Sequence, residues 1–194
     1  MIPPTTNAVK RKPAPAGLQL ARCVQVIDLG TQPAGKHTPR RKVLLGFELP
    51  RCPRETADDT QECYIVWENF TLTLYEKGRL RPFVEAWLGK KLTPSEVATF
   101  DLKSLLGKVC QLLLVHNESD GTTYANIQTI VPADSDGFPD QQNENKYFFI
   151  NDFDREVFET FGDSLQSKIK RSPEYQAKVG GVDEVFAEAD DIPF

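Results

Sequence analysis

The sequence predicts a mainly β protein in which a helix is inserted between the third and fourth strands. Apolar residues alternate with a period of two in several separate segments, as expected of strands that bury one face. After the third segment the apolar spacing changes to that of an amphipathic helix. The pair Asp120-Gly121 separates the last two strand-like segments and indicates a hairpin turn. The 194 residues are enough for one well-filled core with appendages.

The clearest strand covers Tyr64–Tyr75, with the sequence YIVWENFTLTLY. One of its faces is apolar apart from Glu68 and is expected to lie in the core. The other face is half polar but carries Trp67 and Tyr75. Aromatic residues on the wetter side of a strand suggest a surface that a ligand contacts. The alternative is that the two rings pack beneath a loop.

The same patterns place the other strands and the loops between them. The predicted strands, in chain order, are Leu18–Ile27, Val43–Leu49, Tyr64–Tyr75, Lys108–Val115 and Tyr124–Val131. The predicted loops are the turn-rich Leu29–Pro39, the segment Pro50–Glu62 and the polar segment Pro132–Lys146.

Helical spacing first occurs over Leu80–Leu88, with Pro82 in the first turn and Gly89 as the stop. Trp87 falls on the apolar face of this helix and is expected to be buried.

Two further helices are expected. A short one is predicted to begin after Thr93, because Pro94 just inside it and Glu96 three residues on complete a capping box. The closing segment Phe153–Ile169 has the spacing of an amphipathic helix, which is weakened at Gly162.

Three strands, a helix and then a hairpin form the element order of a five-stranded Greek-key barrel of the OB type, whose helix plugs the barrel. The predicted fold is therefore such a barrel with an added C-terminal helix and a disordered acidic tail. Ligands of OB barrels lie across strands two and three, between the one–two and four–five loops. In this chain those loops are Leu29–Arg41 and His116–Thr123.

Aromatic and basic side chains converge on that surface, which is the composition of a site for single-stranded nucleic acid. Bases stack on aromatic rings at about 1–3 kcal/mol each, and cations contact the phosphates, so such a site tolerates any sequence. The alternative to a binding site is that Lys36, Arg40 and Arg41 belong to an ordinary solvated loop. The predicted binding residues are Lys36, Arg40, Arg41, Lys42, Trp67, Tyr75 and Tyr124, followed by Lys77 and Arg79 as second-rank candidates.

The sequence lacks the signals of several other classes. The four cysteines form no CxxC pair, so no zinc site is expected, and Cys23 and Cys110 in strand-like runs are expected to be buried. Because there is no Walker loop, GxSxG or HExxH motif, we expect neither an enzyme nor a cofactor. No secretory signal and no run of about 20 apolar residues is present, so a reducing cytoplasm is expected.

Charge divides the chain into a neutral body and an acidic end. The formal net charge is −5, and the five carboxylates after residue 182 account for all of it. We expect a flexible basic arm over residues 1–16, a binding domain over 17–175 and a disordered acidic tail over 176–194. An acidic tail that ends in Ile-Pro-Phe suits a basic-rimmed apolar pocket on a partner. A purely solubilising tail is the alternative.

The ending DDIPF resembles the C-terminal tip of bacterial and phage single-stranded-DNA-binding proteins. Segments of the body are similar to a phage and prophage OB-fold group. These segments are Leu74-Tyr75-Glu76-Lys77 with Leu80-Arg81, Phe100-Asp101-Leu102 with Leu106-Gly107-Lys108, and Tyr124-Ala125-Asn126-Ile127. The glycine-rich linker common before the bacterial tip is reduced here to Gly180-Gly181.

The resemblance implies an OB barrel that coats single-stranded DNA during replication, recombination and repair, in a bacterial or phage-infected cell. It also implies that the tip recruits partner enzymes. The residues that match the tip are Asp190, Asp191, Ile192, Pro193 and Phe194. The alternative function is an OB-fold protein-interaction adaptor that binds no nucleic acid.

An anionic tail beside a basic surface can occupy that surface when DNA is absent. Deleting residues 183–194 is therefore expected to tighten DNA binding at low salt, with the gain disappearing as salt screens the charges. Titration of the full and shortened chains with oligo-dT, followed by fluorescence, measures this. Equal affinities at low salt would contradict the competition.

Overall fold

One antiparallel sheet organises the chain, and the computed structural model describes residues 12–55 and 61–180 of it. The strands are β1 (Gly17–Ala34), β2 (His37–Glu55), β3 (Gln61–Thr71), β4 (Val109–Ser119), β5 (Thr122–Pro132) and β6 (Lys146–Phe148). The helical segments are α1 (Leu80–Leu88), α2 (Pro94–Thr99), η1 (Leu102–Leu105), η2 (Ile150–Asp152), α3 (Arg155–Glu159), α4 (Asp163–Lys170), α5 (Pro173–Tyr175) and η3 (Gln176–Gly180).

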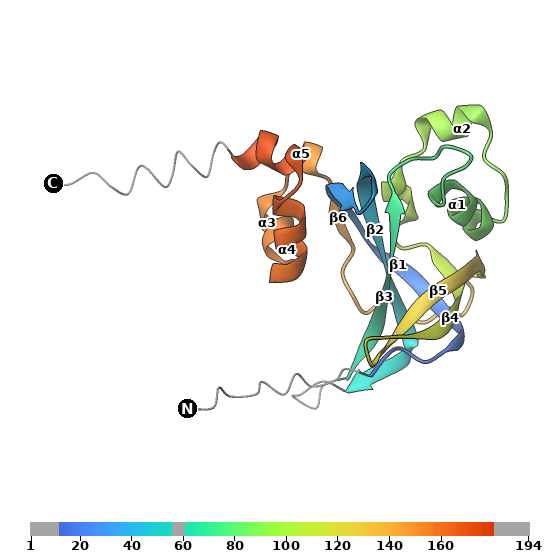
Figure 1. Cartoon of the computed structure of the whole chain (residues 1–194). Coiled ribbons are helices and arrows are strands. Elements are labelled where there is room, and N and C mark those ends of the chain that lie inside the picture. The colour runs from blue at the N-terminus through green and yellow to red at the C-terminus, as the bar shows by residue number, and fades with distance from the viewer. Residues whose placement is uncertain (1–11, 56–60, 181–194) are drawn as a thin grey trace, which may run out of the picture.

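The strand order is β3-β2-β1-β4-β5, with every neighbouring pair antiparallel, and β6 joins β1 in parallel. The helices α1 and α2 connect β3 to β4, so the predicted mainly β fold with a helix between the third and fourth strands is confirmed (Figure 1). Among the described residues no backbone ladder joins β3 to β5, although the two strands flank one groove.

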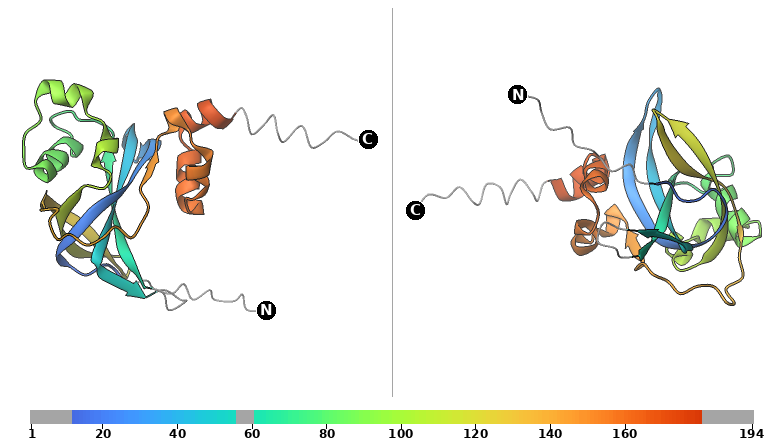
Figure 2. Two further views of the ribbon diagram at one scale, coloured as in Figure 1. Left: turned by 180° about the vertical axis from the view of Figure 1, so that it is seen from behind. Right: turned by 90° about the horizontal axis from the view of Figure 1, so that it is seen from below.

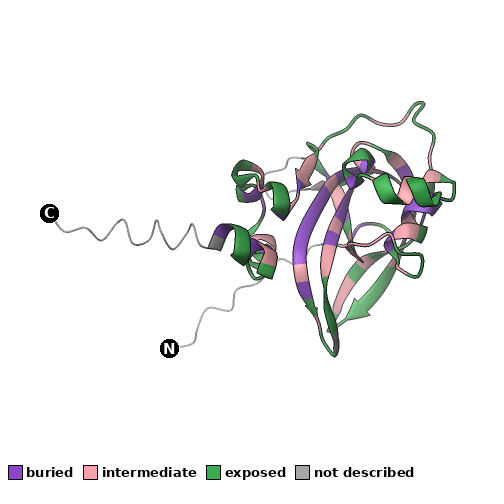
Figure 3. Ribbon diagram, turned by 90° about the horizontal axis from the view of Figure 1, so that it is seen from above, coloured by how far each residue is buried: buried purple, intermediate pink, exposed green. Residues whose placement is uncertain are grey.

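The main core lies between the sheet and α1. Trp87 is buried, as predicted, and its indole Nε1 donates a hydrogen bond to the carbonyl oxygen of Val109 at 2.9 Å. The ring centroid of Phe47 on β2 lies 5.4 Å from that of Trp87 and 6.2 Å from that of Phe83. Buried residues run along the middle of the long strands, while exposed ones gather on the helices and hairpins (Figure 3).

Local signals placed α1, α2 and the β4–β5 turn correctly. Gly89 caps α1 with φ 65°, a left-handed conformation that glycine adopts without steric cost. Thr93 and Glu96 form the predicted capping box of α2. Asp120 and Gly121 both have positive φ, as the predicted two-residue hairpin requires.

The predicted loop Leu29–Pro39 is wrong, because β1 and β2 continue through it as a long hairpin that turns at Gly35-Lys36. Shifts of register on β1 interrupt the period of two there, which hid the strand from pattern reading. Pro33 and Pro39 are tolerated, because proline is compatible with a strand wherever its missing N–H faces an open edge.

The predicted strand Tyr64–Tyr75 is correct only as far as Thr71. The amide of Leu72 makes the last bond to β2, with the carbonyl of Arg41 at 2.8 Å. The chain then turns, and the amide of Gly78 donates to the carbonyl of Tyr75. Tyr75 therefore lies beyond the strand instead of on its outer face.

The single closing helix predicted over Phe153–Ile169 is also wrong, because the chain breaks into α3 and α4 at Gly162, where ψ is 152°. Helical structure then continues to residue 180, past the predicted start of the tail at 176, and buries Val179. Both ends of the predicted loop Pro132–Lys146 belong to strands, since β5 ends at Pro132 and β6 begins at Lys146.

Residues 146–180 form a C-terminal unit with a core of its own against β1. Phe148 lies 5.6 Å from Phe158 and 5.4 Å from Phe161, centroid to centroid, and these rings pack with Ile27 and Leu29 of β1. The unit and the α1–α2 segment lie on opposite sides of the long strands (Figures 1 and 2). The side chain of Ser172 packs directly on the backbone of Gly30 in β1. A Cβ at Gly30 would lie 2.3 Å from the Ser172 hydroxyl oxygen.

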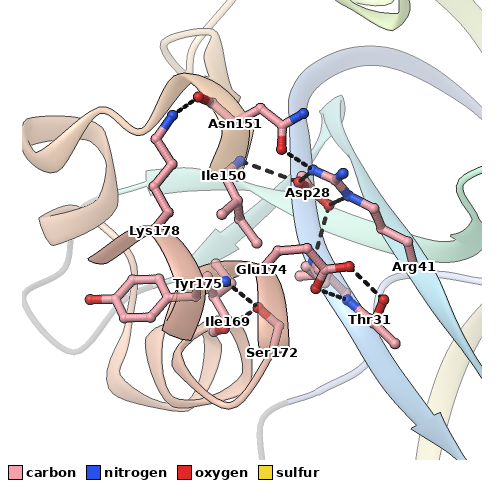
Figure 4. A network of polar contacts seen from close by, with 12 residues as sticks. Asp28, Thr31, Arg41, Ile150, Asn151, Ile169, Ser172, Glu174, Tyr175 and Lys178 are labelled. Atoms are coloured by element: carbon pink, nitrogen blue, oxygen red, sulfur yellow. Dashed lines mark hydrogen bonds and ion pairs between the residues drawn. The ribbon is translucent and has the colours of Figure 1, made fainter. Parts of the chain in front are cut away.

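A buried carboxylate fastens this unit to the sheet (Figure 4). Asp28 is fully buried and accepts hydrogen bonds from both Nε and Nη2 of Arg41 and from the amides of Gly30 and Ile150. Nearby, Glu174 of α5 accepts from the hydroxyl and the amide of Thr31, at 2.6 and 2.8 Å. The open edge of β1 beyond β6 is thus closed by side chains of the C-terminal unit.

Asp28→Ala is expected to lower the free energy of unfolding by about 3 kcal/mol, because it leaves the Arg41 guanidinium and buried amides without an acceptor. Urea unfolding measures this, and hydrogen exchange should show lost protection first in residues 146–180. Arg155→Ala is the control. It removes an exposed pair with Glu159 and should cost less than about 0.5 kcal/mol. Equal losses in the two variants would contradict the role of Asp28.

Candidate nucleic-acid interface

Trp67 stands on the outer face of β3 with about half of its surface exposed (51%). Its indole Nε1 donates to the side-chain oxygen of Gln25 on β1 at 3.0 Å, and the ring crosses β2 at Gly46. A Cβ at Gly46 would lie 2.9 Å from the Gln25 Cβ and 3.0 Å from the Trp67 Nε1. The glycine thus makes room for an indole whose orientation is fixed before any ligand arrives.

Trp67 and Tyr124 line one groove of about 530 Å³ between β3 and β5. Tyr124 is also 51% exposed, so both rings offer a surface to a ligand. The groove contains two cationic residues, Lys12 and Arg54, and Arg54 is paired with Glu62 at 2.7 Å. Sequence reasoning did not assign Lys12 or Arg54 to the site, because only the tertiary structure brings them beside β5.

One wall of the groove is held by a second buried carboxylate. Glu48 of β2 accepts hydrogen bonds from the amide and the side-chain nitrogen of Asn143, at 2.9 and 3.0 Å, and from the amide of Gln142 at 3.2 Å. Arg22 lies 3.5 Å from the same carboxylate. This fixes Asn143, a groove residue, on the sheet. No sequence motif marked Glu48, since its amide partners Gln142 and Asn143 lie 94 and 95 residues away.

The predicted cations of the hairpin are spread along it and do not line the groove. Lys42 lies on the same face of β2 as Gly46, and its Nζ donates to the Thr71 hydroxyl at 3.0 Å. Lys36 and Arg40 are exposed near the turn. Arg41 donates hydrogen bonds to Asp28. These bonds raise the pKa of the Arg41 guanidinium, although burial acts to lower it.

Tyr75 belongs to a different hollow. It is 63% exposed and lines a cavity of about 560 Å³ together with apolar residues of α1 and α2. Lys77 is exposed in the turn that follows. Arg79 pairs with Glu68 at 2.7 Å and lies over the ring of Phe70. The structure therefore brings together Trp67 and Tyr124, but neither Tyr75 nor the cations at 77 and 79 lie with them.

Burial raises the pKa of each of the four cysteine thiols. All four cysteines are free and buried. Burial raises the pKa of Cys23 to about 12, and burial together with the nearby Glu48 carboxylate raises that of Cys63. Within the parts of the chain that the structure describes, no cluster of His, Cys, Asp or Glu could hold a metal ion. The helices of those same parts are too short or too polar to cross a bilayer.

The predicted partner-binding tip, Asp190–Phe194, lies outside the described residues. No known protein family matches this chain. A search of curated proteins likewise gives no relative.

Gly46→Ala is expected to displace the indole of Trp67 from Gln25, because the new methyl group would meet both side chains. A red-shifted tryptophan emission and stronger quenching by acrylamide would report the release, since Trp87 stays buried. Gly162→Ala is the matched control, because a Cβ there meets no atom within 4 Å. Unchanged emission in the Gly46 variant would contradict the close fit.

Proposed function

We propose that this protein binds single-stranded DNA, with the groove between β3 and β5 as its base-stacking site. The observation that carries the proposal is the pair of half-exposed rings, Trp67 and Tyr124, which come from different strands and line one groove. Two half-exposed rings in one groove give a ligand a concave aromatic surface to contact. A base offers a flat π face that suits either ring.

The surroundings of the rings support a nucleic acid over an apolar small molecule. Lys12 and Arg54 line the groove, and Lys42 continues the same face of β2 toward the hairpin. Cations beside stacking rings are the arrangement that holds a single strand by its phosphates while the bases stack. Stacking reads no base edges, so the proposed binding is independent of sequence.

The proposed fold is an OB-type barrel. Its support is the element order, in which three strands, a helical segment and a hairpin follow one another, and the pairing of β1 with both β2 and β4. The groove between β3 and β5 lies where such a barrel would close. The cations assigned from sequence on the hairpin, and Tyr75, stay predicted contacts.

We further propose that the tip Asp190–Phe194 recruits replication, recombination or repair enzymes. Its support is the sequence alone, in which two acids precede Ile-Pro-Phe. This part of the proposal is independent of the groove.

A protein-interaction adaptor is the second candidate function. The observation that favours it is the modest charge of the groove, because the Arg54 cation is already paired with Glu62. Half-exposed aromatic residues also form the centres of protein–protein interfaces.

Titration with oligo-dT separates the two. We expect saturable quenching of Trp67, with a log–log salt slope near −3 if about four phosphates are neutralised. Trp67→Ala and Tyr124→Ala should each weaken binding roughly 5- to 150-fold, as expected for the loss of one stacked base. Anisotropy of a dye-labelled oligo-dT measures these variants, because Trp67→Ala removes the quenching signal. Leu18→Ala is the control, because Leu18 is exposed (59%) but lies outside the groove. Absence of saturable quenching at low salt would reject DNA binding and favour the adaptor.

A further inference from the structure

We infer that the bound strand has a second contact, made to its phosphates alone, where the end of the β1–β2 hairpin meets α4. This inference rests on the proposed function and extends the path of the DNA beyond the stacking groove. The residues that would make the contact are Arg40 of β2 with Lys168 and Arg171 at the end of α4.

A chain of contacts joins the two elements that carry these residues. Gln32 of β1 is the cross-strand partner of Arg40. Its side-chain nitrogen donates to the carbonyl oxygen of Lys168 at 3.1 Å, and Gln32 itself is buried (8%). The hairpin and the last turn of α4 are therefore in contact, although they lie far apart in the sequence. Arg40, Lys168 and Arg171 are all exposed.

Two carboxylates near this junction, Asp28 and Glu174, make their hydrogen bonds to other residues than the three junction cations. Asp28 is taken by Arg41, and the Glu174 carboxylate points its oxygens at Thr31. Burial raises the pKa of Glu174, but its hydrogen bonds, including the two from Thr31, and the nearby charge of Arg41 together lower the pKa below its usual value. Among the ion pairs of residues 12–55 and 61–180, none includes Arg40, Lys168 or Arg171.

The junction carries cations without stacking rings. The exposed large apolar side chains of the described residues are Leu18, Trp67, Tyr75, Tyr124 and Val131, and none of them belongs to the hairpin end or to α4. A surface of this composition recognises a polyanionic backbone and no base. The contact is therefore electrostatic, independent of sequence and sensitive to salt.

The distance along β2 sets the length of DNA that reaches both contacts. Gly46, beside Trp67, and Arg40 are six residues apart on β2, which corresponds to about 20 Å at ~3.3 Å per residue. Lys42 lies between them. A very short oligonucleotide can occupy the groove alone, whereas a longer strand can reach α4 as well.

The simpler explanation is that cations in the last turn of α4 only stabilise the helix dipole. The double variant Lys168→Ala/Arg171→Ala in the full chain distinguishes the two. With oligo-dT of about 30 nucleotides the salt slope should fall in magnitude by about 0.7 for each lost phosphate contact, whereas with about 5 nucleotides it should not change. Lys90→Ala/Lys108→Ala removes the same charge near α1 and β4 and should leave both slopes unchanged.

The outcomes are separable. Unchanged slopes with the long oligonucleotide, while Trp67 is still quenched, would overturn the second contact and leave the proposed function intact. A lower melting temperature with unchanged slopes would assign the cations to the helix alone. If deleting residues 183–194 abolishes the difference between variant and parent, the surface serves the acidic tail and the inference fails. Absence of any binding by the parent chain would remove both proposals.

Discussion

The buried carboxylate of Asp28 is the contact on which the arrangement of the whole molecule depends. A buried, ionised carboxylate is costly unless it is paired and fully hydrogen-bonded. Here the partners come from three places, namely Gly30 in the same strand, Arg41 in β2 and Ile150 in the C-terminal unit. Satisfying one side chain therefore joins the hairpin to residues 146–180, and the apolar cluster around Phe148 completes the attachment.

A second buried carboxylate, Glu48, does the same for the segment before β6. Its partners Gln142 and Asn143 hold that segment against β2 and β3. Asp28 and Glu48 thus hold two separate segments against the sheet, the C-terminal unit and the segment that contains Gln142 and Asn143. Trp67 is left half-exposed. Its indole is held by the hydrogen bond to Gln25 and fits into the space that Gly46 leaves free.

Charge and aromatic surface are separated in this structure. The rings of Trp67 and Tyr124 lie in a groove with few cations, whereas the exposed cations of the hairpin and of α4 lie where no ring is exposed among the described residues. A single-stranded nucleic acid that is bound as proposed would stack its bases on the rings in the groove and place its phosphates against the cations elsewhere. Such a division favours a ligand that is long, anionic and unpaired over a compact one.

The sequence by itself determined what local physics controls. The period of two in β3, the caps of α1 and α2 and the Asp-Gly turn depend on neighbouring residues, and these predictions were confirmed. The burial of Trp87 follows from the same kind of periodicity, whereas the sequence left open whether Trp67 packs beneath a loop. The tertiary structure alone decided the rest. Pairing of β1 with β2 continued across the register shifts and lengthened the hairpin. Arg41 paired with the buried Asp28, and the tertiary structure placed Tyr124, but not Tyr75, in one groove with Trp67. These outcomes depend on partners far away in the chain, which no local pattern specifies.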